Sequence, residues 1–581
     1  MGAEEVPCGS FISDPAVDNA ELNDTDLVFT IRTALASVQN GDTDQYDQLV
    51  QLMYIKKESD GVEVSDDVDV VAQRETLLKI LSRSVACLDE VHHKRLLELI
   101  LGTRIWDHKS NVNVMYVFLD LIVSLATTNG KYLIYCLDML ISNLRSQPRI
   151  LNDKMLEVVS RVHASLDKIS YLVPHASSKL LPILAQRMPS ICAKDHLQVV
   201  VPYVENLFKL ENSSIGKVVG NVILKLIMER LRDLDIAMFD MELDVAVEGS
   251  MNEGEEFPVR SLDQKRNVVS KLLDDLMDLS FNHLEACQKA GRLDEVFEYL
   301  FESFENFILN TQNTKSSQFL MFYACSLDPE NCGVKFASKL LDIFLSSNKH
   351  QLTRTNAVDY LASYLSRAKF LPASFVASML KRLVDESADY CRTCNDDAVP
   401  EVHQVFYSGC QAILYVLCFR MRSILDVPGF RSQLTPLKSV LSHKLDPLKM
   451  CHPLVVSNFR KQAKAAGLFI VSEAYTLNGL PKSELSRERL VLFFPFDRII
   501  SPYEDELLPE VTVYGGDTDS EEDCDDDVVL NNEEDCDDDV VLNNEVNKMS
   551  ITPKHSFMCK TERLLKMPSR IRPSTSPRES L

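Results

Sequence analysis

The sequence predicts an all-α fold, a HEAT-repeat-like α-solenoid with an acidic internal loop and disordered termini. Glycine is sparse, with 18 residues in 581, and tryptophan occurs once, which suits long helices better than a glycine-punctuated enzyme. Helical spacing of apolar residues continues along most of the chain, whereas alternation bounded by hairpin turns is nearly absent. Two helices recur about every 40 residues, the period of HEAT-type repeats. Stacking such pairs would bury their apolar faces in one continuous core.

The N-terminal half contains a close succession of predicted helices. Two of them end at Asn-Gly steps, Asn40-Gly41 and Asn129-Gly130, where glycine can adopt the left-handed conformation that terminates a helix. Successive pairs show no clear self-similarity, so the repeat prediction rests on helix length and period. The predicted helices are Asp26–Gln39, Val112–Thr128, Lys131–Arg145, Leu151–Ser165, Ser177–Arg187, His196–Leu210 and Ile215–Leu231.

An acidic segment, residues 233–263, interrupts this series. Gly249, Gly254 and Pro258 break its helical pattern, so we expect a loop inserted in the solenoid. The helix after this segment is predicted from apolar residues at positions i, i+3, i+4 and i+7. These residues are Val269, Leu272, Leu273 and Leu276.

Five short blocks stand out in the C-terminal two thirds of the chain. They are FLMFYACSLDP (Phe319–Pro329), AVDYLASYLSRAKFLP (Ala357–Pro372), FYSGCQAILYVLCFR (Phe406–Arg420), LDPLKMC (Leu445–Cys451) and FFPFDR (Phe493–Arg498). The first three have the apolar spacing of amphipathic helices. Their spaced residues are Leu320, Tyr323, Ala324 and Leu327, then Leu361, Tyr364, Leu365 and Ala368, then Cys410, Ile413, Leu414 and Leu417.

Asp-Pro occurs at two expected helix starts, Asp328-Pro329 and Asp446-Pro447. Aspartate is a good N-cap, and proline at the first helical position loses no N–H that the helix needs. We therefore interpret both steps as helix caps.

The chain changes character near both ends. Residues 1–23 are polar and predicted to be disordered, and residues 24–503 form the solenoid. Residues 504–547 are an acidic disordered segment in which EEDCDDDVVLNN occurs twice in tandem, at Glu521–Asn532 and Glu533–Asn544. A perfect duplication indicates a segment that tolerates insertion. Residues 548–581 form a basic tail rich in Ser and Pro.

Most of the net charge of −25 lies in one place. Residues 499–547 contain no Lys or Arg, and 19 acidic residues fall between Glu504 and Glu545. Affinity for nucleic acid comes largely from Lys and Arg, so we expect little or no direct nucleic acid binding and basic protein partners instead. We expect the acidic segment to speed encounter with such partners or to keep the free protein off DNA.

No secretory signal and no apolar run of the ~18 residues that span a bilayer is recognised, so no membrane partner is expected. The 15 cysteines are an odd number and are scattered, many of them within apolar helical blocks, which is typical of reduced thiols. Cys136, Cys325, Cys410 and Cys418 are expected to be buried.

The sequence nominates no catalytic, cofactor-binding or metal site. Cys391 and Cys394 form a CxxC step with His403 and Cys410 downstream, but the spacing does not match a zinc site, and we interpret it as a loop plus a core cysteine. The adjacent His92 and His93 are expected on a solvated surface. The phosphate-binding and hydrolase motifs G-x-x-x-x-G-K-[ST], G-x-G-x-x-G, G-x-S-x-G and H-E-x-x-H are absent.

In their order, their residues and their spacing, the five blocks closely resemble those of the RNA polymerase I-specific transcription initiation factor family, known as TIF-IA. The block SYLVPHASSKLLPILAQRMP (Ser170–Pro189) and the acidic segment around Met238–Asp244 also fit, so that the resemblance runs from about Leu27 to Tyr503. It implies a HEAT-repeat solenoid without catalytic activity. Such a factor binds RNA polymerase I near its stalk and brings it to the promoter-bound core initiation factor at ribosomal RNA genes, in the nucleus and nucleolus.

The resemblance also implies control of polymerase binding by protein kinases, with a serine-bearing docking surface in the N-terminal half. The candidate docking residues here are Ser177, Ser178 and Lys179, although the two serines could instead cap the helix that starts there. Ser520 lies in an acidic run that suits an acidophilic kinase. Thr552 and Ser576 precede proline, so they suit proline-directed kinases.

Two other interpretations remain open. A different HEAT solenoid, such as a nuclear transport receptor or a phosphatase scaffold, would have more repeats of greater regularity. A helical enzyme would have a deep pocket with convergent titratable residues.

Overall fold

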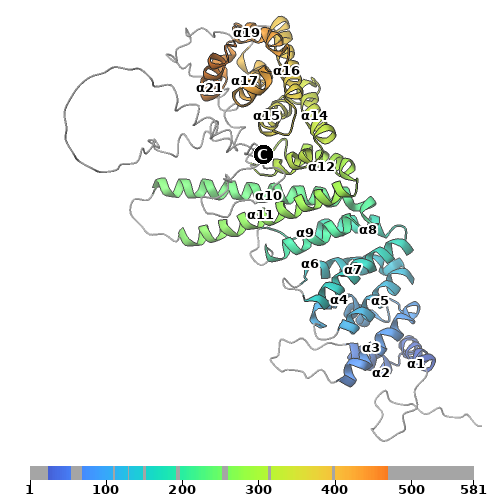
Figure 1. Ribbon diagram of the computed structural model, residues 1–581. Helices are drawn as coiled ribbons and strands as arrows, with labels where there is room; N and C mark the ends of the chain where they lie inside the picture. Colours follow the sequence, from blue (N-terminus) through green and yellow to red (C-terminus); the bar gives the residue numbers. More distant parts are fainter. Residues whose placement is uncertain are drawn as a thin grey trace, which may run out of the picture. The chain divides into compact units, whose positions relative to one another are not determined.

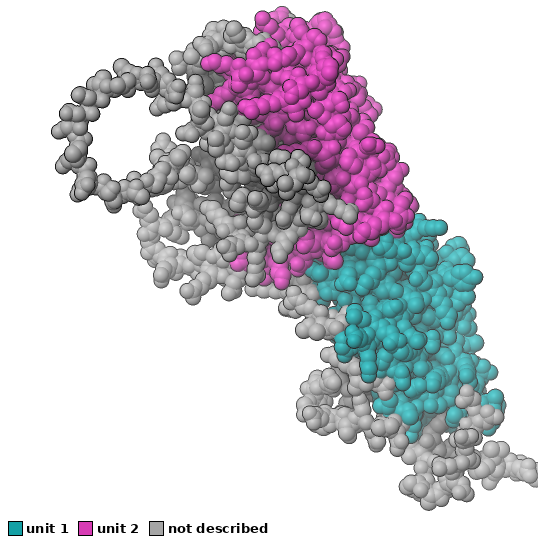
Figure 2. Space-filling model, in the orientation of Figure 1, with its two compact units in different colours: residues 1–226 teal, residues 227–581 magenta. Residues whose placement is uncertain are grey.

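The computed structural model describes residues 24–53, 68–108, 112–128, 130–147, 152–191, 197–251, 259–311, 314, 316–394 and 399–468. Regular structure within these ranges is entirely helical, which confirms the predicted all-α solenoid (Figure 1). The chain divides into two compact units, unit 1 (residues 1–226) and unit 2 (residues 227–581), coloured separately in Figure 2. The predicted N-terminal disorder, the FFPFDR block, the acidic segment and the basic tail lie outside the described residues.

Unit 1 is built from helices that pack against their next-but-one neighbours. Helix α3 contacts α1 and α5, α5 contacts α7, and α6 contacts α8. This arrangement is typical of helix pairs stacked along one direction. The helices are α1 (Asp24–Ser37), α2 (Asp44–Met53), α3 (Val68–Ser82), α4 (Lys94–Gly102), α5 (Val112–Thr128), α6 (Leu133–Arg145), α7 (Asp153–Leu172), α8 (Ala176–Arg187) and α9 (Leu197–Glu211), followed by the start of α10 (Gly216–Met251).

The predicted helix ends of unit 1 are largely confirmed. A short 3₁₀ turn after α1 ends at Gly41, whose φ of 85° is in the left-handed region, as expected of the Asn-Gly stop. Helix α5 has the predicted bounds. Helix α7 runs seven residues beyond the predicted Ser165, because Leu166 and Ile169 continue its buried stripe.

The prediction of a loop over residues 233–263 is wrong for most of that range. Helix α10 continues to Met251, and α11 begins at Val259. Leu231, Leu234 and Met238 are buried at helical spacing, so this acidic stretch has an apolar face to pack. The carboxylate of Asp235, on the same buried side, accepts hydrogen bonds from the N–H groups of Ser316 and Ser317. Such contacts outweigh the local preference of aspartate for turns.

Unit 2 contains the remaining helices. They are α11 (Val259–Lys289), α12 (Leu293–Phe307), α13 (Gln318–Leu327), a π-helical turn (Pro329–Gly333), α14 (Val334–Leu345), α15 (Gln351–Arg367), α16 (Ala373–Thr393), α17 (Gln404–Leu425), α18 (Phe430–Gln433), α19 (Thr435–Leu441), α20 (Pro447–Met450) and α21 (Pro453–Ala465).

Two helices of unit 2 are buried on every side, although their spacing predicted amphipathic helices. The whole run Thr355–Arg367 of α15 is buried, and α17 packs against α15, α16 and α21. With the turn before it, α17 (Pro400–Leu425) is apolar and long enough to cross a membrane, and 83% of its most apolar window is buried in the protein. Helix α17 is therefore the central core helix of unit 2. In unit 1 the helices Val112–Thr128 and Gly130–Arg145 are long and apolar enough to cross a membrane only when taken together, and the pair is bent by 115° at the break between them.

The two Asp-Pro steps behave differently. Asp328 caps the π-helical turn as predicted, since its side chain accepts a hydrogen bond from the Asn331 N–H. Asp446 precedes α20 in the left-handed conformation, with φ of 49°, and its side chain pairs with Lys449 instead of capping the helix. The four cysteines predicted to be buried are buried with free thiols: Cys136, Cys325, Cys410 and Cys418.

Candidate docking surface

The candidate docking residues lie at the turn between α7 and α8 in unit 1. Helix α8 begins at Ala176, one residue before the predicted start, and the Ala176 N–H bonds to the Val173 carbonyl across the turn. Ser177 is 9% exposed and lies with Leu180 and Leu184 on the buried stripe of α8. Ser178 and Lys179 are exposed on the opposite side. The structure thus places two of the three candidates on the surface.

Neither serine acts as the N-cap of α8. That position is taken by His175, whose side chain makes no capping bond. The Ser178 hydroxyl donates to the His175 carbonyl at 2.9 Å. Pro182, one turn further along α8, has no N–H, so the Ser178 carbonyl lacks the donor that a regular helix would supply. Ser178 therefore presents both a hydroxyl and a carbonyl group near the surface.

Apolar side chains surround this turn. Tyr171 is 87% exposed and Leu172 is 50% exposed at the end of α7. Aromatic residues are enriched at protein interfaces, where one tyrosine can bury a large area at low entropic cost. We call Tyr171, Leu172, Ser178 and Lys179 the α7–α8 surface.

Unit 2 contains a cavity of about 290 Å³ between α14, α15, α16 and the start of α17. Two of its charged residues have structural partners: Lys349 Nζ lies 2.7 Å from Glu305, and Arg354 Nε donates to the Phe344 carbonyl at 2.7 Å. Ser387, also in the lining, donates to the Leu383 carbonyl. Val402, 60% exposed, lies at the rim. The lining suits an apolar side chain of a partner better than an acid–base reaction.

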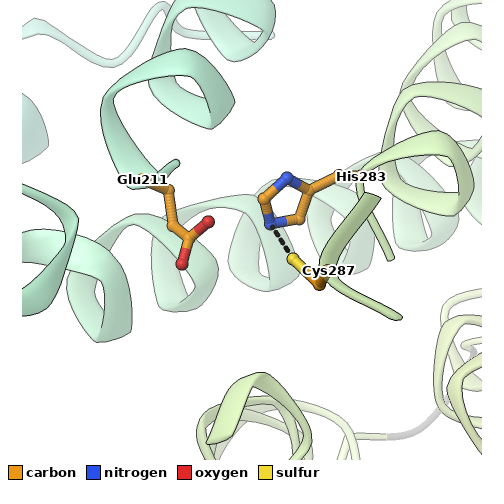
Figure 3. A group of neighbouring side chains, drawn as sticks. All are labelled: Glu211, His283 and Cys287. Carbon is orange, nitrogen blue, oxygen red and sulfur yellow. Dashed lines mark hydrogen bonds between the residues drawn. The ribbon is translucent and has the colours of Figure 1, made fainter. Parts of the chain in front are cut away.

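Two residues that could ligate a metal lie one turn apart on α11. His283 Nε2 is 3.4 Å from the sulfur of Cys287, and both side chains are buried (Figure 3). Glu211, drawn in the same figure, belongs to unit 1, where its side chain lies over Gly220 of α10. A structural zinc takes four protein ligands, so the pair that unit 2 supplies does not by itself make such a site.

The CxxC step differs from its interpretation as a loop. Cys391 lies in the last turn of α16, and Cys394 follows as its C-cap. His403 is engaged elsewhere, with its Nδ1 2.9 Å from the Tyr390 hydroxyl, and Cys410 is a core residue of α17.

The prediction of a solvated His92-His93 pair is wrong for His93. This residue is fully buried, with Nε2 2.8 Å from the Leu35 carbonyl and Nδ1 accepting from the Asp89 N–H. His92 is the exposed member, and its bond to Asp89 holds the pKa of that carboxyl at about 2. Ser520, Thr552 and Ser576 lie outside the described residues.

The helical architecture and the side chains described above do not by themselves indicate a function. Membership of a protein family is therefore the observation that decides it. The sequence model described as "RNA polymerase I specific transcription initiation factor RRN3" matches residues 20–261 and 247–508. The chain belongs to this family. All residues that the structure describes fall within the matched ranges, which extend over both units.

Relatives in the RRN3 family are similar at low identity. The chain is 24% identical over 538 residues to the RNA polymerase I-specific transcription initiation factor rrn3 of Schizosaccharomyces pombe, covering 84% of this chain and 86% of that protein. It is 26% identical to the mouse factor RRN3, covering 61% of this chain and 60% of that protein.

A solved structure of the RRN3 family has the same fold. The crystal structure of RNA polymerase I transcription initiation factor Rrn3 superposes with a TM-score of 0.65 at 19% identity, covering 83% of this chain and 97% of that one. At this identity the likeness concerns the fold alone, and it supports the predicted solenoid.

Proposed function

We propose that this protein is a non-catalytic adaptor that binds RNA polymerase I and links it to the promoter-bound core initiation factor at ribosomal RNA genes. Membership of the RRN3 family is the observation that carries this proposal. Joining two weak contacts in one body raises the occupancy of the bridged state without new chemistry. The protein would act in the nucleus, within the nucleolus, where these genes are transcribed.

The α7–α8 surface is the proposed contact with the polymerase, near its stalk. Tyr171 and Leu172 supply exposed apolar area, and Lys179 supplies a charge beside the Ser178 hydroxyl. Ser177 is buried, so the proposal rests on Ser178 rather than on both serines. The second contact would lie on unit 2, where Val399 and Val402 are 61% and 60% exposed.

Phosphorylation of Ser178 would act on docking more than on folding. Ser178 is the third residue of α8, where the helix dipole favours a negative charge, so the phosphate would not disrupt the helix. It would place a charge of about −2 next to Tyr171 and Leu172, and covering that charge with an apolar partner is unfavourable. We therefore expect protein kinases to weaken polymerase binding through this site.

The first test is a pull-down of purified RNA polymerases I, II and III with the full-length protein, before and after phosphatase treatment. Selective capture of polymerase I, changed by the phosphatase, is the expected result. Equal capture of all three would indicate a general scaffold, such as a nuclear transport receptor or a phosphatase scaffold.

The same assay tests the α7–α8 surface. Tyr171→Ser and Ser178→Asp should each reduce capture of polymerase I, whereas Ser178→Ala should bind as the unmodified protein does. The matched control is Val91→Ser, because Val91 is 82% exposed at another turn of unit 1. Equal losses in Tyr171→Ser and Val91→Ser would show that the surface has no special part in binding.

A further inference from the structure

The sign of the charge reverses in the last part of unit 2 that the structure describes. From Ile227 to Phe419 the sequence contains 18 Lys or Arg residues and 30 Asp or Glu residues. From Met421 to Leu468 it contains eight Lys or Arg and only two acids. This second stretch holds the end of α17 and all of α18–α21. We call it the basic end, and it contrasts with the net charge of −25 of the whole chain.

The basic end is one packed body. Helices α18, α20 and α21 contact α17, and α19 contacts α16, α18 and α20. Figure 1 shows α19 and α21 beside α17. Arg431 of α18 donates to the carbonyls of Ala466 and Gly467 after α21, at 2.9 and 3.4 Å. Arg460 is half-buried and seven further cationic side chains are exposed: Arg422, Arg431, Lys438, Lys444, Lys449, Lys461 and Lys464.

The basic end has more cationic residues than acidic ones. Asp446 pairs with Lys449, and Asp426 is the only other acidic residue of the stretch, which leaves an excess of six positive charges. Like charges this close repel one another, because several lie within the Debye length of about 8 Å at physiological salt when they share a helix. Lys461 and Lys464, three residues apart on α21, are such a pair. The surface is therefore suited to an anionic partner.

We propose that this partner is the acidic segment of the same chain, Glu504–Glu545. It contains 19 acidic residues and no Lys or Arg. Each tandem copy of EEDCDDDVVLNN carries six carboxylates, which equals the positive excess of the basic end. One copy can neutralise the surface, and the duplication provides two equivalent segments.

The covalent connection favours this partner over a separate one. Leu468, the last described residue, lies on the basic end, and 35 residues separate it from Glu504. A linker of this length can span at most about 120 Å. A helix as long as α17 measures only about 33 Å, so the linker is long enough for the acidic segment to contact any part of the basic end. Tethering gives an effective concentration that can reach the millimolar range. A nucleic acid or an acidic protein would have to displace the segment before it could bind.

Carbodiimide cross-linking of the full-length protein tests this contact, because the reagent joins carboxylates directly to lysine amines. Mass spectrometry with proteases that do not require Lys or Arg should find links from the tandem copies to Lys438, Lys461 and Lys464. The links should fall severalfold at about 0.5 M NaCl, where the Debye length is about 4 Å. Links to Lys548, close to Glu545 in sequence, should form at either salt concentration and serve as the internal control.

A full-length variant provides the second measurement. The six acids of each copy are changed to amides, as in Glu521→Gln and Asp525→Asn. Acetylation of Lys438, Lys461 and Lys464 by an amine-reactive ester should then become severalfold faster. Lys94, Lys154 and Lys217, exposed lysines of unit 1, are the matched controls and should react at unchanged rates.

Two results would overturn the proposal. If neutralising both copies leaves acetylation of the basic end unchanged, the acidic segment does not cover it. Equal binding of heparin by the unchanged protein and by the amide variant would then identify the basic end as a surface for external polyanions. If the cross-links are confined to lysines after residue 547, the acidic segment pairs with the basic tail, which has eight Lys or Arg and two acids.

Discussion

The hydrophobic cores of the two units contain different kinds of side chain. Unit 1 stacks helices with mainly aliphatic side chains, such as Leu121, Ile122, Leu137 and Leu140, all fully buried. Unit 2 has a continuous group of rings, in which Phe336 lies within 6.1 Å, centroid to centroid, of Phe301, Phe304, Phe322 and Tyr364. Many of these pairs are edge-to-face, a geometry that adds specificity to apolar burial.

The buried charges differ in the same way. Among the residues that the structure describes, Glu211 is the one charged side chain buried in unit 1, whereas unit 2 buries Asp235, Asp359, Arg367 and Arg420. Arg420 donates to the carbonyls of Ala368 and Leu371, at the end of α15. The long-range buried bonds of unit 1 are made by uncharged groups, as between His93 and the Leu35 carbonyl, whereas unit 2 also depends on the bonds that satisfy buried charges. Substitutions should therefore be more costly in unit 2.

The largest effect is expected at Asp235. Its carboxylate accepts hydrogen bonds from the N–H groups of Ser316 and Ser317 at 2.7 and 2.9 Å, and from the Ser317 hydroxyl at 2.9 Å. Asp235→Ala would leave these buried donors unsatisfied and should lower the free energy of unfolding by about 2–4 kcal/mol. Urea unfolding measures this loss. Asp240→Ala, at an exposed position of the same helix, should change stability by less than about 0.5 kcal/mol.

A smaller effect is expected where α17 meets α14. A Cβ atom on Gly409 would lie 3.0 Å from the ring of Phe344, which is itself buried, so Gly409→Ala should cost about 1–3 kcal/mol by overpacking. In unit 1, nothing lies within 4 Å of a Cβ atom on Gly102, and Gly102→Ala should stabilise by up to about 1 kcal/mol. Equal thermal shifts in the two variants would contradict the difference in packing between the units.

Local spacing predicted most of the helices but could not predict the bonds between residues far apart in the sequence. Val112–Thr128 was predicted to the residue, because its apolar pattern ends at an Asn-Gly step. The continuation of α10 past Leu231 was missed. The partners that accommodate Asp235 are 81 and 82 residues away in sequence. Burial of His93 was missed for the same reason, since its partner Leu35 is 58 residues away.

The sequence pattern around the candidate docking residues predicts the burial of some side chains but not the exposure of others. Ser177, Leu180 and Leu184 are spaced at i, i+3 and i+7, so the sequence already places Ser177 on the buried stripe of α8 and Ser178 off it. The exposure of Tyr171 and Leu172 had no such signal, because an apolar helix end can equally well be covered by a neighbouring helix.

The next effect depends on pH and is confined to α11 in unit 2. Burial, with help from Asp278 and Asp275, raises the pKa of Asp274 to about 7. The folded state then binds this proton more tightly than the unfolded state, so stability falls as pH rises towards and through 7. Between about pH 6 and pH 8 the loss should be roughly 1 kcal/mol, allowing for partial solvent screening. Asp274→Asn should remove this slope in urea titrations. A slope that persists in the variant would assign it to another group.

The smallest effect is expected at an ion pair of unit 1. Arg187 at the end of α8 makes a two-pronged contact with Asp138 of α6, Nε to Oδ1 at 2.6 Å and Nη2 to Oδ2 at 2.5 Å. This contact raises the pKa of Arg187, and both side chains remain about one-third exposed. Arg187→Lys keeps the charge but loses the fork, so stability should fall by only about 0.5 kcal/mol and less at high salt. A loss as large as that of Asp235→Ala would show that unit 1 also depends on a single contact between charged side chains.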